Sequence, residues 1–305
     1  MNKNFIGNDE AYHQLSSYTK MAHPGPLILQ GKRGLGKKRA AISLAAHLLG
    51  CGEEKLQQSK DFTMIDKGKE SVKVEDILSL LDKSVFASLS AVRVFLICHA
   101  DKVNVQAQNK LLKLLEDRNQ TNIVIFLCER DSLLPTIKSR CMTIEFSALK
   151  HEEMEEYLSD NGITQDIPLV SALCDHCPYL LDEVKEVYPS LREIYLNILA
   201  ITRREDLLRV FHLVAEKDAQ EFYSVHGDHY MTALQMLQHL FYSLLCAKVS
   251  PSPDGAAEKG FEGLMRLYSV RDALLICMAV SRHQDRWLTG VYSKNDFFDL
   301  VRVMV

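Results

Sequence analysis

The sequence predicts an α/β fold, in which a five-stranded parallel sheet is followed by an all-helical second half. Short apolar, β-branched runs alternate with helix-like patterns between Pro26 and Phe146, and no convincing strand-like run follows Ala148. The chain of 305 residues is long enough for a full α/β domain and one or two smaller lobes. Buried strands that alternate with helices indicate a parallel sheet covered on both faces.

The expected strands are short apolar runs that carry few charges. They are LILQ (27–30), DFTMID (61–66), VRVFLICHA (92–100), NIVIFLCER (122–130) and MTIEF (142–146). Between them, residues 40–49 read AAISLAAHLL and stop at Gly50, a residue that favours the end of a helix. Residues 104–117 place leucines on one wide stripe, which is typical of a helix that covers a sheet.

The second half of the chain has the pattern of amphipathic helices. We expect breaks between them at DNGI, HCPY, VYPS and SPSPDGAAEKG, which contain the residues that end helices. The predicted domains are an α/β domain over 1–147, a small helical lid over 148–200 and a helical bundle over 201–305.

Composition is that of an ordinary folded protein, with 47% hydrophobic residues, 25% charged residues and a formal net charge of -4. The eight cysteines are scattered, which suits a reducing compartment. Asp9 and Glu10 lie where a signal peptide would be apolar, and the longest apolar run, residues 232–249, contains Gln, His and Lys. We therefore expect a cytoplasmic protein without a membrane anchor.

Residues 31–38, GKRGLGKK, follow the first strand and meet the phosphate-loop pattern GxxxxGK[ST] except at its last position. Gly31, Gly34 and Gly36 would let backbone N–H groups face an anion, and Lys37 would reach its phosphates. Lys38 replaces the hydroxyl that binds Mg²⁺. At about 4 Å and an effective dielectric of 20, its charge repels a divalent ion by about 8 kcal/mol.

This degenerate loop predicts weak or no nucleotide binding, no metal and no hydrolysis. Lys38 could instead neutralise a phosphate without metal, so ATP, ADP or phosphate binding stays open. The alternative is a basic glycine turn without a ligand, in which Lys32, Arg33 and Arg39 are solvated.

The carboxylate pair of an ATPase is missing from the end of the central apolar strand. Cys98 and His99 occupy the two positions, and Asp101 lies beyond them. Neighbouring residues on a strand point to opposite faces, which argues against a Cys98–His99 nucleophile and base. A buried thiol and a packed or surface histidine are the favoured interpretation.

Residues 93–117, RVFLICHADKVNVQAQNKLLKLLED, and 122–141, NIVIFLCERDSLLPTIKSRC, together resemble the AAA+ subunits of bacterial DNA polymerase III clamp loaders. The segments FIGNDEAYHQLSSY (5–18) and HPGPLILQGKRGLGKKRAAISLAAHLLGC (23–51) are similar to that family as well. The resemblance covers residues 5–147 and implies an AAA+ P-loop-type domain, a lid and a C-terminal collar that oligomerises.

Ser139, Arg140 and Cys141 match the family's SRC motif, whose arginine reaches a neighbouring subunit's ATP. The resemblance implies a non-hydrolysing subunit rather than the motor gamma/tau subunit. Its partners would be gamma/tau and delta subunits in a hetero-pentamer that loads the sliding clamp on primed DNA. The alternative for Arg140 is a surface salt bridge.

No zinc site is expected, because no cysteine follows Cys51 in GEEKLQQSK and CDHC (174–177) lacks a second ligand pair. HCPYLLDEVKEV carries no arginine where active relatives have one. Two other classes stay open: an active ATPase with unusual metal ligands, and a nucleotide-gated interaction protein. Direct DNA contact is a weaker hypothesis, because the basic residues near the loop would be buried against neighbours or phosphate.

Overall fold

In the computed structural model, the chain divides into two compact units, Met1–Glu153 with Cys177–Tyr179, and Met154–His176 with Leu180–Val305. The structure describes residues 6–68, 72–85, 88, 90–116, 121–206, 227–250, 261–288, 300 and 302–304.

The first unit contains the five-stranded sheet that the sequence predicts. Its strands are β1 (Leu27–Gln30), β2 (Phe62–Ile65), β3 (Arg93–Ile97), β4 (Asn122–Cys128) and β5 (Met142–Glu145). Their order is β2-β3-β4-β1-β5, and every neighbouring pair is parallel. The loop after β1 therefore leaves the carboxyl edge of the sheet between the ends of β4 and β5.

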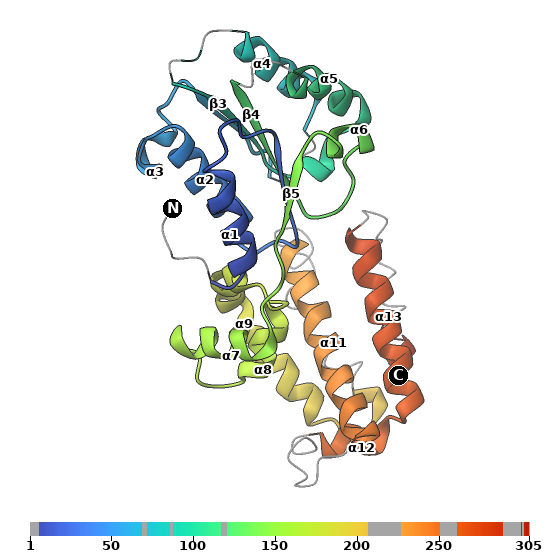
Figure 1. Cartoon of the computed structure of the whole chain (residues 1–305). Helices are drawn as coiled ribbons and strands as arrows, with labels where there is room; N and C mark the ends of the chain where they lie inside the picture. Colours follow the sequence, from blue (N-terminus) through green and yellow to red (C-terminus); the bar gives the residue numbers. More distant parts are fainter. Residues whose placement is uncertain are drawn as a thin grey trace. The chain divides into compact units, whose positions relative to one another are not determined.

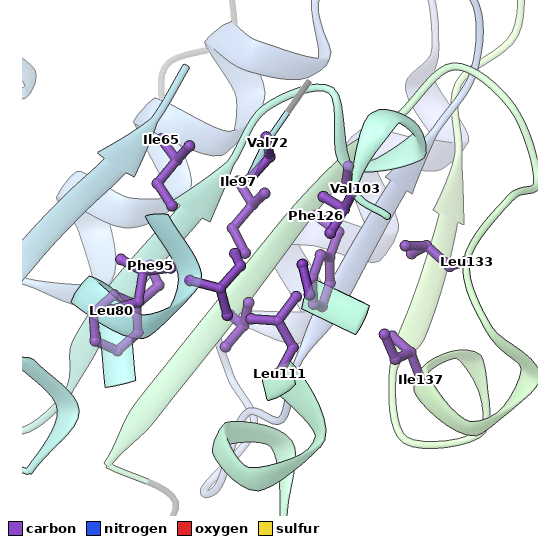
Figure 2. Packing of buried hydrophobic residues seen from close by; sticks show 14 of the residues in the cluster. Ile65, Val72, Leu80, Phe95, Ile97, Val103, Leu111, Phe126, Leu133 and Ile137 are labelled. Carbon is purple, nitrogen blue, oxygen red and sulfur yellow. The ribbon is translucent and has the colours of Figure 1, made fainter. Parts of the chain in front are cut away.

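Helices cover this sheet, and the loop that follows β1 leads directly into α2 (Figure 1). They are α1 (Asp9–Tyr18), α2 (Lys37–Leu48), α3 (Glu53–Leu56), α4 (Val74–Ser84), η1 (Ala100–Lys102), α5 (Val105–Leu115) and α6 (Pro135–Lys138). In Figure 2, Leu80 of α4 and Leu111 of α5 lie over Phe95 and Phe126 of the central strands. Each such side chain contributes about 1.5–3 kcal/mol when it leaves water.

The second unit is helical, as the sequence predicts (Figure 1). The remaining helices are α7 (His151–Asp160), which begins before the boundary between the units, α8 (Ile167–Leu173), α9 (Leu181–Leu199), α11 (Gly227–Val249), α12 (Glu262–Leu267) and α13 (Val270–Leu288). The short helix η2 (Pro178–Leu180) begins in the first unit. Phe241 of α11 packs edge-on against Tyr268, with ring centroids 5.3 Å apart. The separation of a lid (148–200) from a bundle (201–305) stays a prediction.

Two expected breaks agree with the structure and one does not. Helix α7 ends before Gly162, and α8 and α9 are separate helices around HCPY. The break at VYPS is wrong, because α9 continues through Pro189. Buried Val184 and Leu191 lie on both sides of the proline, so their packing offsets the hydrogen bond that proline removes. Most of the fourth break, residues 251–260, lies outside the described residues.

Among the described helices, none is both long and apolar enough to span a membrane.

Candidate functional site

The glycine loop has the position that the sequence predicts, between β1 and α2. The Gly31 N–H donates to the Cys128 carbonyl at 3.1 Å, so the loop begins in register with β4. Gly31, Gly34 and Gly36 all have positive φ, of 146°, 77° and 86°. A Cβ on Gly31 would also lie 2.3 Å from the Phe146 carbonyl oxygen. The backbone path of the loop therefore needs glycine.

Lys37, the predicted phosphate-binding lysine, points into its own loop. Its ammonium donates to the carbonyl oxygens of Gly31 and Lys32, the latter at 2.5 Å, and the residue is 8% exposed. Removal from water lowers the pKa of Lys37, and the nearby carboxylate of Glu129 opposes that effect. The ammonium is thus held by loop carbonyls.

Lys38 forms an ion pair that the sequence analysis did not find. Its Nζ lies 2.6 Å from Oδ2 of Asp66, the residue that follows β2. The hydrogen bond from Lys38 lowers the pKa of Asp66, and the same bond raises the pKa of Lys38. The charge that stands in place of the metal-binding hydroxyl is therefore balanced by a carboxylate of this chain. The final Asp of DFTMID was the only sequence signal for this partner.

Cys98 and His99 follow β3 rather than continue it, because the strand ends at Ile97. Opposite faces of a strand therefore do not explain how the side chains of Cys98 and His99 are separated. Cys98 is 2% exposed, and burial raises its pKa to about 12, so the thiol stays protonated near neutral pH. The structure thus agrees with the favoured interpretation of a buried thiol.

The His99 imidazole lies between two carboxylates at the carboxyl edge of the sheet. The residue adopts a left-handed backbone with φ of 52°. Its ring nitrogens lie 3.9 Å from Asp66 Oδ1 and 3.9 Å from Glu129 Oε1. Asp101 accepts the backbone N–H of Glu129 at 3.3 Å, which ties η1 to the end of β4. Asp101 therefore holds the backbone at this edge.

Arg140 lies at the other edge of the sheet. It follows α6 and comes two residues before β5, which runs parallel to β1 with Leu27 opposite Met142 and Gln30 opposite Glu145. Arg140 is thus near the beginning of β5, whereas the loop follows the end of β1. The structure does not bring Arg140 to this chain's own loop.

The Arg140 guanidinium has two partners in its own chain. Nη1 donates to the Thr136 carbonyl at 2.9 Å, and Nη2 lies 2.9 Å from Glu116 Oε1. The Arg140 side chain is 39% exposed, so it is accessible beside this pair. Ser139 Oγ also donates to the Thr136 carbonyl, and burial raises the pKa of Cys141 to about 12. The SRC motif therefore presents its arginine from a short, hydrogen-bonded turn.

A small cavity adjoins the loop and has a volume of about 10 Å³. It is lined by Ile6, Gly7, Asn8, Tyr12, Leu15, Leu35, Ala40 and Phe146. A space of this size holds about one water molecule. A base or sugar would need these side chains to move.

Comparison with known proteins gives a family model and several curated relatives. A family model described as DNA polymerase III, delta subunit, matches residues 7–150. The delta' subunit of DNA polymerase III from Bacillus subtilis is 26% identical over 213 residues, covering 65% of this chain and 62% of that protein. The delta' subunit from Pseudomonas aeruginosa is 32% identical over 149 residues, covering 43% and 45%.

A replication factor C small subunit from Methanococcus maripaludis is 28% identical over 179 residues, covering 57% of this chain and 55% of that protein. The chain thus spans less than two thirds of the length of these relatives. Among solved structures, a DNA polymerase III gamma subunit-related protein from Thermotoga maritima covers 92% of this chain and 100% of its own at 16% identity, with a TM-score of 0.45.

Proposed function

We propose that this chain is a delta-prime subunit of a clamp loader, because residues 7–150 match the family model described as DNA polymerase III, delta subunit. Similarity to delta' proteins from two bacteria supports the assignment. In this role it assembles with gamma/tau motor subunits and a delta subunit in a hetero-pentamer. The complex loads the sliding clamp on primed DNA during replication.

The chain's own loop does not hydrolyse ATP in this proposal, and the observation that carries it is the 2.6 Å ion pair between Lys38 and Asp66. Mg²⁺ neutralises the phosphates during transfer, and it needs a hydroxyl or carboxylate oxygen at this place. Lys38 offers none and pairs with a nearby carboxylate. Cys98 and His99 add no acid at the end of β3. Any ATP, ADP or phosphate binding at the loop is weak, and no metal is held there.

Arg140 acts instead on the ATP of a neighbouring motor subunit. Its place at the amino edge of the sheet, away from this chain's loop, supports a role in trans. The Thr136 carbonyl and Glu116 hold the guanidinium in an accessible position. An arginine supplied in this way stabilises the charge on the transferring phosphoryl group and contributes about 10³ to 10⁵ in rate.

The test is reconstitution with the cognate motor and clamp-opening subunits. We expect the isolated chain to show no Mg²⁺-dependent ATP hydrolysis. In single-turnover measurements on the complex, Arg140→Ala should remove the fast phase of one motor site, whereas Lys138→Ala should leave it. Lys138 is the matched control because it is a neighbouring cation that pairs with Asp131.

Two results would contradict the proposal. Saturable hydrolysis by the isolated chain that is lost in Lys37→Ala would establish an active ATPase. An unchanged fast phase in the Arg140→Ala complex would refute the arginine in trans.

A further inference from the structure

Cys177–Tyr179 lies on the glycine loop of the first unit. These three residues cluster with the sheet domain, although the residues before and after them in sequence belong to the second unit. The Tyr179 N–H donates to the Gly34 carbonyl at 3.1 Å. Cys177 is 1% exposed, and Pro178 is buried as well. The segment is therefore attached to the loop by a backbone hydrogen bond.

The Tyr179 ring rests on Gly36, the residue that precedes α2. A Cβ on Gly36 would lie 2.6 Å from Cε2 of the ring and 3.2 Å from Cδ2, so the ring touches the glycine backbone directly. On the same helix, the Arg39 guanidinium lies 5.9 Å from the ring centroid. The ring thus covers the first turn of α2, where a phosphate lies on a loop of this type.

The Tyr179 hydroxyl oxygen is buried, and within the described part of the chain it has no hydrogen-bond partner. A buried hydroxyl without a partner costs about 1–3 kcal/mol, and this cost opposes the gain from packing the ring. The contact with Gly36 is therefore held by the apolar part of the ring and weakened by its polar end. The contact between the Tyr179 ring and Gly36 can therefore open at a moderate cost in free energy.

We propose that Cys177–Tyr179 is a strap that holds the glycine loop shut, with the Tyr179 ring as its latch. The strap is a barrier to phosphate, and it is separate from the Lys38–Asp66 pair. The strap limits the access of phosphate to the loop, whereas Lys38 disfavours Mg²⁺ there. The inference does not depend on which complex the chain joins, because every contact that carries it lies in the first unit.

The test compares the full chain with Tyr179→Ala, which removes the ring, and Tyr179→Phe, which keeps the ring and removes the hydroxyl. Hydrogen exchange of the amides of residues 34–38 reports opening of the loop. Calorimetric titration with pyrophosphate, without Mg²⁺, reports access. In Tyr179→Ala we expect amide exchange at least about tenfold faster and pyrophosphate affinity about tenfold higher, which is about 1.4 kcal/mol. Tyr179→Phe keeps the ring and removes the costly buried hydroxyl, so its pyrophosphate affinity should be no higher than that of the unmodified chain.

Unchanged exchange or unchanged pyrophosphate affinity in Tyr179→Ala would overturn the strap. If circular dichroism shows that Tyr179→Ala does not fold, Tyr179→Leu replaces it, because leucine keeps apolar volume without a flat ring. The same two results are then required of Tyr179→Leu. None of these measurements uses the clamp-loader ATPase, so failure of the strap is distinct from failure of the proposed function.

Discussion

The Lys38 ammonium lies 2.6 Å from the Asp66 carboxylate and joins the first turn of α2 to the residue after β2. Lys38→Met breaks this pair, and we expect the free energy of unfolding to fall by about 0.5 kcal/mol, because the lysine is half exposed and solvent screens the interaction. Urea denaturation measures the loss. Lys150→Met, at an exposed residue, is the control and should change stability less.

The same pair predicts a pH dependence with a defined sign. The pKa of Asp66 is lowered from 3.8, so its contribution is present above that value and is lost as pH falls through the folded pKa. The pKa of Lys38 is raised from 10.5, so its contribution is present below that value and is lost as pH rises through the folded pKa. The stability difference between Lys38→Met and the unmodified chain should be level between these limits and shrink outside them. A difference that grows at acid pH would contradict the ion pair.

Glu116 provides a test that separates the two roles of Arg140. Glu116→Gln removes the charge partner of the guanidinium but leaves the Thr136 carbonyl in place. If Arg140 acts on a neighbour's ATP, the reconstituted complex should keep its ATPase with Glu116→Gln and lose the fast phase of one site with Arg140→Ala. If the surface salt bridge is the whole role, both variants should lose up to about 1 kcal/mol of stability and neither should change hydrolysis.

Asp61 and Arg93 form a buried ion pair at the amino edge of the sheet. The two residues are 2% and 5% exposed, and Asp61 Oδ1 lies 3.3 Å from Arg93 Nη2. Asp61 Oδ2 also accepts the Ser90 N–H at 2.6 Å. Asp61→Ala should cost about 3–5 kcal/mol in urea denaturation, because it removes the carboxylate from the buried Arg93 guanidinium.

The control for that measurement is Asp131→Ala, since Asp131 pairs with Lys138 while 56% of its side chain is exposed. We expect this variant to stay within about 0.5 kcal/mol of the unmodified chain. Equal losses at the two sites would show that the Asp61 pair is not desolvated.

Thiol chemistry should divide the cysteines by burial. Burial raises the pKa of Cys98, Cys128 and Cys141 to about 12, so few thiolates form at pH 8. Cys246 is exposed. Iodoacetamide at pH 8 should label Cys246 first, and label the other three only after urea unfolds the chain; peptide mass spectrometry gives the order. Early labelling of Cys98 would revive a reactive role for that thiol.

The sheet and the helical second half could be predicted because their signals are local. LILQ, DFTMID and NIVIFLCER each contain enough buried apolar residues to mark a strand, and Gly50 and Gly162 mark the ends of α2 and α7. Pro189 was the exception. A proline is a strong local signal, but helix α9 keeps an apolar face on both sides of it. Packing over the whole helix is not visible in a four-residue motif.

The loop's departure from the phosphate-binding pattern was also visible in sequence, because it depends on which residue occupies position 38. The residues that surround the loop in the fold were not visible in the sequence. Asp66 lies 28 residues after Lys38 and Tyr179 lies 143 residues after Gly36, so only the fold brings these pairs together. Neither residue type is unusual at its position. The roles assigned to Arg140 and to the loop remain predictions that the reconstitution experiment tests.

The parallel register of β1 and β5 gives the domain a direction, with the glycine loop at one end and Arg140 at the other. In the proposed complex, subunits with such unlike ends would join head to tail, in the manner of a heterologous interface. A member that offers an arginine but needs none in return would then end the row of catalytic sites. Under the proposed function, the residue at position 38 thus bears on where that row stops, as well as on chemistry.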